Sequence, residues 1–522
     1  MPGISASCNR VVWQFNMVFG MVRLFQRKFM AMTRVSLAAL PVETPDIQLC
    51  PYDRSDVTPG IVHLGIGAFH RAHMAAYVDD LLKENPSWGI IGASLRRPDT
   101  RDALAPQDFL YTLAIREASG TKCRIIGSIL DVLDANTQRA QLIETMASSA
   151  IRIVSLTVTE KGYCHDPSTG ELDENHPDIV HDLAHPDEPI SAPGIIVAAL
   201  ALRHQRGLIP FTVMSCDNLP SNGKTAGRIV RRFAQLRGNS ELTNYVQSAS
   251  FPSTMIDRIV PATTDADREI VNKIIGLEDA WPIMTEPFTQ WVIEDDFPAG
   301  RPPFETVGAE LVEDVEPFEL MKLRMLNGSH STMAYLGYLC GYQYVSEAIA
   351  DRGIHKLIHG LMTDEVMATL PMPRATLEAY RDQLLARFAN PALKHRTWQI
   401  AMDGTQKLPQ RLLGTIRDRL EKGEPIQRLA LGVAAWMRYV TGIDEAGNPI
   451  DVKDPHAARL RQIADGAGGN AEKLASGLLA VQEVFGTDLP SNAAFAELVT
   501  RHLRSLFEHG AAVTIAALER LP

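Results

Sequence analysis

The chain has 522 residues, more than a single hydrophobic core normally organises, so we expect two domains. Apolar residues make up 45% and charged residues 22%, which is typical of soluble globular proteins. The net charge of −11 argues against a nucleic-acid surface, which needs a basic face. Anionic small substrates stay possible, because a pocket can be locally basic within an acidic protein.

The six cysteines are scattered and contain no CxxC pair. This distribution argues against a disulfide framework or a structural zinc site and favours the reducing cytoplasm. No run approaches the 18 apolar residues of a membrane-spanning helix, so we expect no membrane association.

Residues 1–40 differ from the rest of the chain, with five basic residues before the first acidic one, Glu43. Their apolar run 11–22 is interrupted by Gln14 and Asn16, and it lacks a small-residue cleavage site. A poor signal peptide or a basic amphipathic helix are the alternatives. We expect a disordered or dispensable extension, with Met30 or Met32 as alternative starts.

A strand, a glycine turn and a helix are predicted from residue 61 onwards. The apolar run 61–64 is followed by Gly65 and Gly67, and a helical pattern then extends past Tyr77. In such a unit the first glycine permits a tight turn, and the second lets a pyrophosphate approach the helix N-terminus. We therefore expect a dinucleotide to bind at Gly65, Gly67, Ala68, Phe69 and His70, with His70 in place of the usual third glycine.

A second strand, 88–95, ends next to Arg96 and Asp99. An acid at this position in a dinucleotide-binding domain holds the ribose 2′-OH of NAD. The neighbouring arginines could instead accept the 2′-phosphate of NADP. We expect NAD, with NADP as the alternative.

Further buried strands are predicted at 151–158 and 211–215, with a helix at 194–206 between them. Strands that alternate with helices indicate an α/β fold with a doubly wound parallel sheet. Ligands bind at the carboxyl ends of such strands, where Glu160 and Asn218 lie. We assign residues 41–310 to this Rossmann-type domain.

Residues 311–522 are predicted to form a mostly α-helical substrate domain. Helical periodicity is present near 320–338, 374–388, 409–422, 427–441, 456–465, 471–485 and 492–517. The cleft between the two domains is then the expected active site.

Lys322, Asn327 and His330 lie at the start of this helical half. With about 100° per residue, Asn327 is about 140° and His330 about 80° from Lys322 around an α-helix. An ammonium, an amide and an imidazole on one wide face could move a proton at a secondary alcohol and hold its oxygen. The alternative is a helix with a snorkelling lysine and a hydrogen-bonded histidine.

Taken together, these motifs resemble the polyol-specific long-chain dehydrogenase/reductase family, also called the mannitol dehydrogenase family. The resemblance extends from about residue 51 to the C-terminus and rests on the stretches 61–73, 159–163, 215–218, 251–259, 286–291 and 322–330. It implies a Rossmann domain, a helical domain and NAD-dependent oxidation or reduction of a small sugar or sugar acid. We expect a monomer or small homo-oligomer.

Within that family, residues 388–411 and 429–439 are most similar to the fructuronate reductase subgroup. This similarity implies interconversion of D-fructuronate and D-mannonate with NAD(H). Mannitol 2-dehydrogenases have an arginine where this chain has Gln399, although their nearby lysine is retained as Lys407. A dehydrogenase for a neutral polyol such as mannitol or arabinitol is the alternative, and an NAD-binding sensor without activity is a third.

The resemblance also implies roles for individual residues. Lys322 is the expected general acid/base without a metal, which requires a pKa well below the usual value for lysine. Asn218 and Asn327 are expected to hold the reacting oxygen, and His330 to orient the substrate. Glu319 is expected to relay protons to solvent, with a role as a surface acid on the helix as the alternative.

A uronate carboxylate should meet a cation, since arginine binds carboxylates through two hydrogen bonds. Arg396, Lys407 and Arg411 are candidates, with Lys407 favoured. Asp257 is expected to be either a substrate-binding acid or an ion-pair partner of the adjacent Arg258. His70 and His73 could form a metal pair, but no third ligand is suitably spaced, so we expect no metal.

Overall fold

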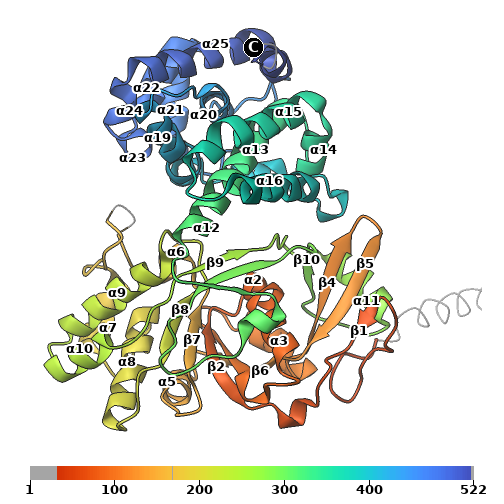
Figure 1. Cartoon of the computed structure of the whole chain (residues 1–522), viewed down its shortest axis with the longest axis vertical. Coiled ribbons are helices and arrows are strands. Elements are labelled where there is room, and N and C mark those ends of the chain that lie inside the picture. The colour runs from red at the N-terminus through yellow and green to blue at the C-terminus, as the bar shows by residue number, and fades with distance from the viewer. Residues whose placement is uncertain (1–31, 167–168, 519–522) are drawn as a thin grey trace, which may run out of the picture.

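The computed structural model describes residues 32–166 and 169–518. Its first half is built around sheets, and its second half is a bundle of helices joined to the first half near α12 (Glu316–Met321) (Figure 1). This arrangement confirms the predicted fold class. Within the described residues, no helix combines the length and apolar character needed to cross a membrane.

The central sheet of the first half has five parallel strands in the spatial order β6-β3-β2-β7-β8. This order changes direction between β2 and β7, so their carboxyl ends border a crevice of the kind that binds dinucleotides. The predicted strands at 61–64, 88–95, 151–158 and 211–215 are all found in this sheet. The strands are β6 (Ile129–Asp134), β3 (Gly89–Ser94), β2 (Pro59–Leu64), β7 (Ile153–Leu156) and β8 (Thr212–Ser215).

Both faces of this sheet are covered, which explains why its strands are continuous apolar runs. Alternate residues of β2 enter different cores: Val62 and Leu64 pack on one side of the sheet and Ile61 on the other. The first side is covered by α5 (Arg139–Met146), α8 (Ala192–Gln205) and α9 (Asn222–Leu236), and the second by α3 (Met74–Leu81).

Two smaller sheets were not expected from the sequence. One has the order β1-β5-β4-β10 and contains an antiparallel β4–β5 hairpin, and the other has the order β12-β11-β9. Because some of their strands are partly exposed, their sequences lack long apolar runs. Their strands are β1 (Ile47–Gln48), β4 (Tyr111–Glu117), β5 (Gly120–Ile126), β10 (Ile283–Thr285), β9 (Thr254–Asp257), β11 (Gln290–Glu294) and β12 (Glu310–Val312).

The expected extension 1–40 is too long at its C-terminal end. Val35 is fully buried, and its backbone N–H donates to the carbonyl of Glu278 at 2.9 Å. Arg34 also pairs with the Glu278 carboxylate at 3.0 Å. These contacts make residues 33–35 part of the domain, while residues 1–31 of the extension lie outside the described residues.

The helical half has one large apolar core that includes the helices predicted at 374–388, 427–441 and 492–517. The last of these contains a break at Gly510, where φ is 77°. The principal helices are α13 (Gly328–Leu339), α14 (Val345–Ala350), α15 (Arg352–Gly360), α16 (Arg374–Phe388), α17 (Thr397–Ala401), α18 (Gly404–Leu408), α19 (Gly414–Glu421), α20 (Gln427–Tyr439), α21 (Ala457–Ala467), α22 (Ala471–Leu479) and α25 (Ala493–Leu518).

Within the described residues, three π-helical turns interrupt this α-helical domain. They are η5 (Lys322–Asn327), η6 (Leu361–Val366) and η9 (Pro409–Leu413). The turn η5 packs against both η6 and η9. π-helical turns are rare and often occur at functional sites.

Candidate active site at the domain junction

A pocket at the junction of the two domains contains the predicted catalytic lysine. The Rossmann half contributes the loop after β8 and the strand β9, and the helical half contributes α12, η5 and η9. Its polar lining residues are Asp217, Asn218, Thr254, Glu319, Lys322, Asn327 and Gln410. The structure therefore brings together four residues that the sequence placed in one site: Asn218, Glu319, Lys322 and Asn327.

The Lys322 ammonium joins the two domains, since its Nζ donates to Asn218 Oδ1 at 2.8 Å. Burial lowers the pKa of Lys322 below its ordinary value of 10.5. The positive charges of Arg411 and Arg387 add to this lowering, while Asp257 and Glu319 oppose it. A lysine with a lowered pKa can lose and regain a proton more readily near neutral pH.

The angle predicted between Lys322 and Asn327 is wrong, because this turn is not an α-helix. The backbone N–H of Gly328 bonds to the carbonyl of Leu323, five residues earlier. With this pattern, residue 327 lies one turn above residue 322 rather than about 140° away. Both side chains consequently line the same pocket.

The loop that carries Asn218 is fixed by its neighbour Asp217. This carboxylate accepts hydrogen bonds from the backbone N–H groups of Val158 and Thr159, at 3.0 and 2.9 Å, and from the Tyr163 hydroxyl at 2.7 Å. Burial raises the pKa of Asp217 to about 6, although these hydrogen bonds act in the opposite direction. Asp217 thus ties together the loops after β7 and β8, and it gives the stretch 159–163 a structural role.

His330 is buried on α13, beyond the π turn. Its ring packs against Phe388 and meets His395 edge-on, with centroid distances of 4.7 and 5.3 Å. Burial keeps the pKa of His330 well below 6.5, so its imidazole is neutral at pH 7. Its Nε2 has no hydrogen-bond partner among the described residues, which leaves this atom able to bind a hydroxyl group.

The Glu319 carboxylate lies in the pocket beside Lys322 and accepts from the backbone N–H of Ser221, at 3.1 Å to each oxygen. Burial raises the pKa of Glu319 above its ordinary value, while the Ser221 hydrogen bond and the Lys322 charge oppose that rise. A half-buried carboxyl with a raised pKa is suited to exchanging protons with a nearby amine. The proton-relay role stays a prediction.

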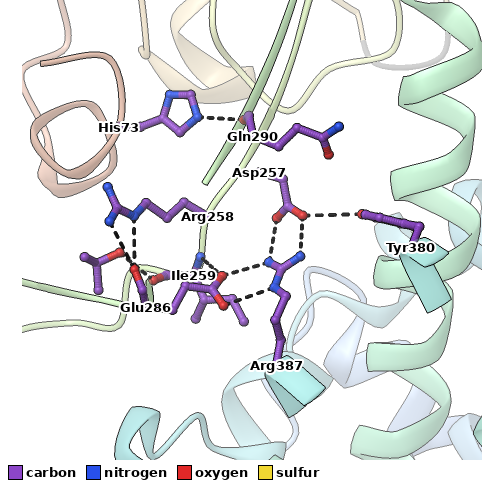
Figure 2. A network of polar contacts seen from close by, with 9 residues as sticks. His73, Asp257, Arg258, Ile259, Glu286, Gln290, Tyr380 and Arg387 are labelled. Atoms are coloured by element: carbon purple, nitrogen blue, oxygen red, sulfur yellow. Dashed lines mark hydrogen bonds and ion pairs between the residues drawn. The ribbon is translucent and has the colours of Figure 1, made fainter. Parts of the chain in front are cut away.

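A buried ion-pair cluster, which sequence reasoning missed, joins the domains next to this pocket (Figure 2). Arg387 on α16 donates to both oxygens of Asp257, at 2.7 and 3.0 Å, and to both oxygens of Glu286, at 3.0 and 2.8 Å. The Tyr380 hydroxyl adds a bond to Asp257 at 3.3 Å. The cluster fixes Asp257, whose negative charge raises the pKa of Lys322.

Asp257 had been expected to bind substrate or to pair with Arg258, and its carboxylate is instead held by Arg387 and Tyr380. Arg258 points to backbone carbonyls, those of Glu286 and Ala72 (Figure 2). The pairing with Arg258 is therefore wrong: adjacent residues of an extended strand point to opposite faces.

The predicted glycine turn follows β2 as expected. Gly65 has φ +94°, and a Cβ there would lie 2.2 Å from the Thr157 carbonyl oxygen, so the turn requires glycine. A Cβ on Gly67 would meet only the Gly65 carbonyl, at 3.8 Å. The space beside Gly67 is thus open to a ligand, and it adjoins α2 (Ala68–Ala72), which begins with Ala68 and Phe69.

The histidines of this segment are packed into the protein rather than arranged as a metal pair. The His70 ring stacks on His63 with a centroid distance of 3.4 Å, and His73 Nε2 bonds to the Gln290 carbonyl at 2.8 Å. Burial holds the pKa of both His70 and His73 far below 6.5.

The remaining predicted cofactor residues lie at the ends of strands. Asp99 begins α4 (Asp99–Leu104) and pairs with Arg97 at 3.0 Å. Arg96 follows β3 and is exposed, and Glu160 follows β7 and is also exposed. Their contact with a dinucleotide stays a prediction.

The three cations proposed for a substrate carboxylate have different surroundings. Arg411 Nη1 donates to the Ser331 hydroxyl at 3.2 Å. Arg396 is exposed, and its guanidinium lies over the Tyr344 ring, 5.9 Å from the centroid. Lys407 Nζ donates to the carbonyls of Ile400 and Met402, at 3.3 and 2.5 Å. Burial lowers the pKa of Lys407 to about 8, with the Arg411 charge adding to the effect.

Two family models match the chain in succession. The mannitol dehydrogenase Rossmann domain covers residues 59–306, and the mannitol dehydrogenase C-terminal domain covers residues 314–507. The chain belongs to the mannitol dehydrogenase family. The resemblance found in the sequence is thereby confirmed, and the protein is an oxidoreductase of this family.

Relatives from this family match the chain over most of its length. The D-mannonate oxidoreductase of Escherichia coli is 47% identical over 494 residues, which cover 93% of this chain and all of that protein. The uncharacterised oxidoreductase YeiQ of E. coli is 48% identical over 88% of this chain and 94% of its own length. The structure of Pseudomonas fluorescens mannitol 2-dehydrogenase, in a ternary complex with NAD and D-mannitol, superimposes with a TM-score of 0.85. It is 40% identical over 94% of this chain and all of that one.

Proposed function

We propose that this protein interconverts D-fructuronate and D-mannonate with NAD(H), with Lys322 as the general acid/base. The observation that carries the proposal is the 2.8 Å hydrogen bond between Lys322 Nζ and Asn218 Oδ1, in a pocket that also contains Asn327 and Glu319. An ammonium and two neutral amides can hold one oxygen atom and exchange a proton with it.

The choice of cofactor is supported by the open space beside Gly67 at the switch point of the sheet, which suits a pyrophosphate. It is also supported by the NAD complex of the P. fluorescens relative. Gly65, Gly67, Ala68, Phe69 and His70 would form the turn around the dinucleotide. The bound nicotinamide supplies the hydride.

In the reduction, the residues of this chain act on the substrate oxygen. Asn218 and Asn327 donate hydrogen bonds to the keto oxygen, and His330 orients a neighbouring hydroxyl. As the keto carbon gains a hydride, Lys322 gives its proton to the oxygen and becomes a neutral amine. Glu319 or solvent then returns a proton to Lys322, and oxidation of the alcohol follows the reverse path.

A uronate is favoured over a neutral polyol by two observations. The D-mannonate oxidoreductase of E. coli is similar over its whole length, and the segment that supplies Gln410 to the pocket also contains the basic residues Lys407 and Arg411. The alternative is a mannitol 2-dehydrogenase, which the 40% identity to the P. fluorescens enzyme supports. Gln399, in place of an arginine of those enzymes, counts against this alternative.

The test is an NADH-absorbance assay with D-fructuronate and D-fructose as substrates, and with NADPH as the competing cofactor. We expect kcat/KM to be higher for D-fructuronate and NADH. Lys322→Ala should lower kcat by about 10²- to 10⁴-fold, the usual contribution of a general acid, while NADH affinity is retained. The exposed Lys473→Ala serves as the matched control, with unchanged rates. A higher kcat/KM for D-fructose would reverse the assignment, and full turnover in Lys322→Ala would remove Lys322 from the mechanism.

A further inference from the structure

Arg411 is a half-buried arginine next to the catalytic pocket, and its surroundings contain no anion for it. It lies on η9, directly after the pocket residue Gln410. Its Nη1 donates to the Ser331 hydroxyl at 3.2 Å. Within residues 32–166 and 169–518, no carboxylate lies at ion-pair distance from it. Burial lowers the pKa of Arg411 to about 10, with only Tyr335 acting against this effect.

Three other arginines of the helical domain differ from Arg411 in this respect. Arg387 binds two carboxylates, Arg419 pairs with Glu424 at 3.0 Å, and Arg324 pairs with Asp418. A guanidinium removed from water without an anion is costly, because nothing replaces the lost hydration. A site that keeps such a cation beside its catalytic pocket is prepared for an anion from outside the chain.

The position of Arg411 fits a ligand in that pocket. The turn η9 packs against η5, which carries Lys322 and Asn327. The contact is close enough that a Cβ on Gly328 would lie 2.8 Å from the Arg411 carbonyl oxygen. The Arg411 charge also lowers the pKa of both Lys322 and His330, which places it in the same electrostatic environment.

The neighbouring charges cannot replace an incoming anion. Lys407 lies four residues before Arg411 and is a second cation, with two of its three donors already used by backbone carbonyls. The nearby acids are engaged as well: Asp257 binds Arg387, and Glu319 binds the Ser221 N–H. The guanidinium of Arg411 therefore keeps N–H donors that can bind an anionic ligand.

We propose that Arg411 is the specificity-determining residue that binds the carboxylate of the sugar-acid substrate through its guanidinium. This inference rests on the proposed function, and it replaces Lys407 as the favoured carboxylate ligand. A planar guanidinium binds a carboxylate through two parallel hydrogen bonds, which a hydroxymethyl group cannot reproduce. Arg411 would thus distinguish a uronate from the corresponding neutral keto-sugar.

The experiment compares Arg411→Met and Arg411→Lys with the wild type on D-fructuronate and D-fructose. Arg501→Met, which removes an exposed arginine of the same domain, is the matched control. We expect Arg411→Met to lower kcat/KM for D-fructuronate by about 100-fold, as for loss of a charge-assisted pair, with a change below about 3-fold for D-fructose. Arg411→Lys should recover part of the loss, and Arg501→Met should resemble the wild type.

A second measurement does not depend on reduction of D-fructuronate. Inhibition of D-fructose reduction by D-mannonate is compared with its inhibition by the neutral D-mannonamide in the wild-type enzyme, and the comparison is repeated with Arg411→Lys. Stronger inhibition by the acid, reduced in the variant, supports the inference even if the wild type fails to reduce D-fructuronate, a result that would reject only the proposed function. Equal inhibition by acid and amide, or equal losses on both substrates in Arg411→Met, would overturn the role of Arg411.

Discussion

Arg387 joins the two domains through two buried carboxylates, so its replacement by methionine tests what holds the junction together. The exposed fractions of the Arg387, Asp257 and Glu286 side chains are 6%, 3% and 1%. Four donor–acceptor contacts between 2.7 and 3.0 Å connect them. Removing the guanidinium leaves two buried carboxylates without a counter-charge, which typically costs about 3–5 kcal/mol. We expect this loss in the free energy of unfolding of Arg387→Met at pH 8.

The assay is urea unfolding followed by tryptophan fluorescence, with Arg374→Met as the matched control on the same helix. Arg374 pairs with Glu378 at 2.9 Å, but both side chains are exposed, so the control should lose at most about 0.5 kcal/mol. The triple variant Arg387→Met, Asp257→Asn, Glu286→Gln should recover part of the stability, since it buries no unpaired charge. If Arg387→Met unfolds at the same urea concentration as Arg374→Met, the reasoning about this cluster is refuted.

The pH dependence of the stability of Arg387→Met tests the direction of this effect. Burial raises the pKa of Glu286 above its ordinary value, and Arg387 acts against that rise. Without Arg387 the folded-state pKa rises further. The contribution of protonated Glu286 to the free energy of unfolding is fully present below its unfolded-state pKa, near 4.3. It is lost as the pH increases through the folded-state pKa. The destabilisation of Arg387→Met should therefore be larger at pH 8 than at pH 5, and an equal loss at both values would contradict the assignment.

Three further predictions concern the pocket and the glycine turn. Because the pKa of Lys322 is lowered, the rate of alcohol oxidation should rise with pH and level off below pH 10.5. The rate of carbonyl reduction should fall over the same range, and steady-state pH profiles in both directions check both trends. Glu319→Gln should lower kcat without changing NADH affinity, and added formate or acetate should restore part of the rate if Glu319 relays protons. Gly65→Ala should lower the melting temperature, because the backbone angle φ of +94° and the nearby Thr157 carbonyl both oppose a Cβ atom. Gly67→Ala should have the melting temperature of the wild type but bind NADH more weakly, as measured by fluorescence titration.

The Rossmann sheet could be predicted because its signals are local. A strand covered on both faces is a continuous apolar run, and the need for glycine at position 65 arises within a few residues. The small sheets lack this signal: β5 has exposed and half-buried residues among its first five and pairs with β4 through backbone atoms. Pairing of that kind is set by tertiary context rather than by the composition of one strand.

The geometry of the π turn that carries Lys322 and Asn327 could not be predicted from apolar periodicity. A π turn shifts the hydrogen-bond register by one residue, and this shift moves Asn327 towards Lys322 without altering the residue types around it. The residues were therefore identified correctly as neighbours in the pocket, while their relative angle was wrong.

The Arg387 cluster was missed because its members are distant in the sequence. Arg387 is 130 residues from Asp257 and 101 residues from Glu286. Arg258 is adjacent to Asp257 and seemed the natural partner, although strand geometry turns it to the other face. Only the folded chain selects among many possible partners for a buried carboxylate.

The bond between Lys322 and Asn218 has a consequence for how this architecture can be recombined. In the proposed mechanism, the proton donor and one of the amides that hold the substrate oxygen come from opposite halves of the chain, so neither half would contain a complete reaction centre. A chimera that fuses the first half of one homologue to the second half of another must preserve this pairing. Where it does, such hybrids should take coenzyme preference from one parent and sugar preference from the other.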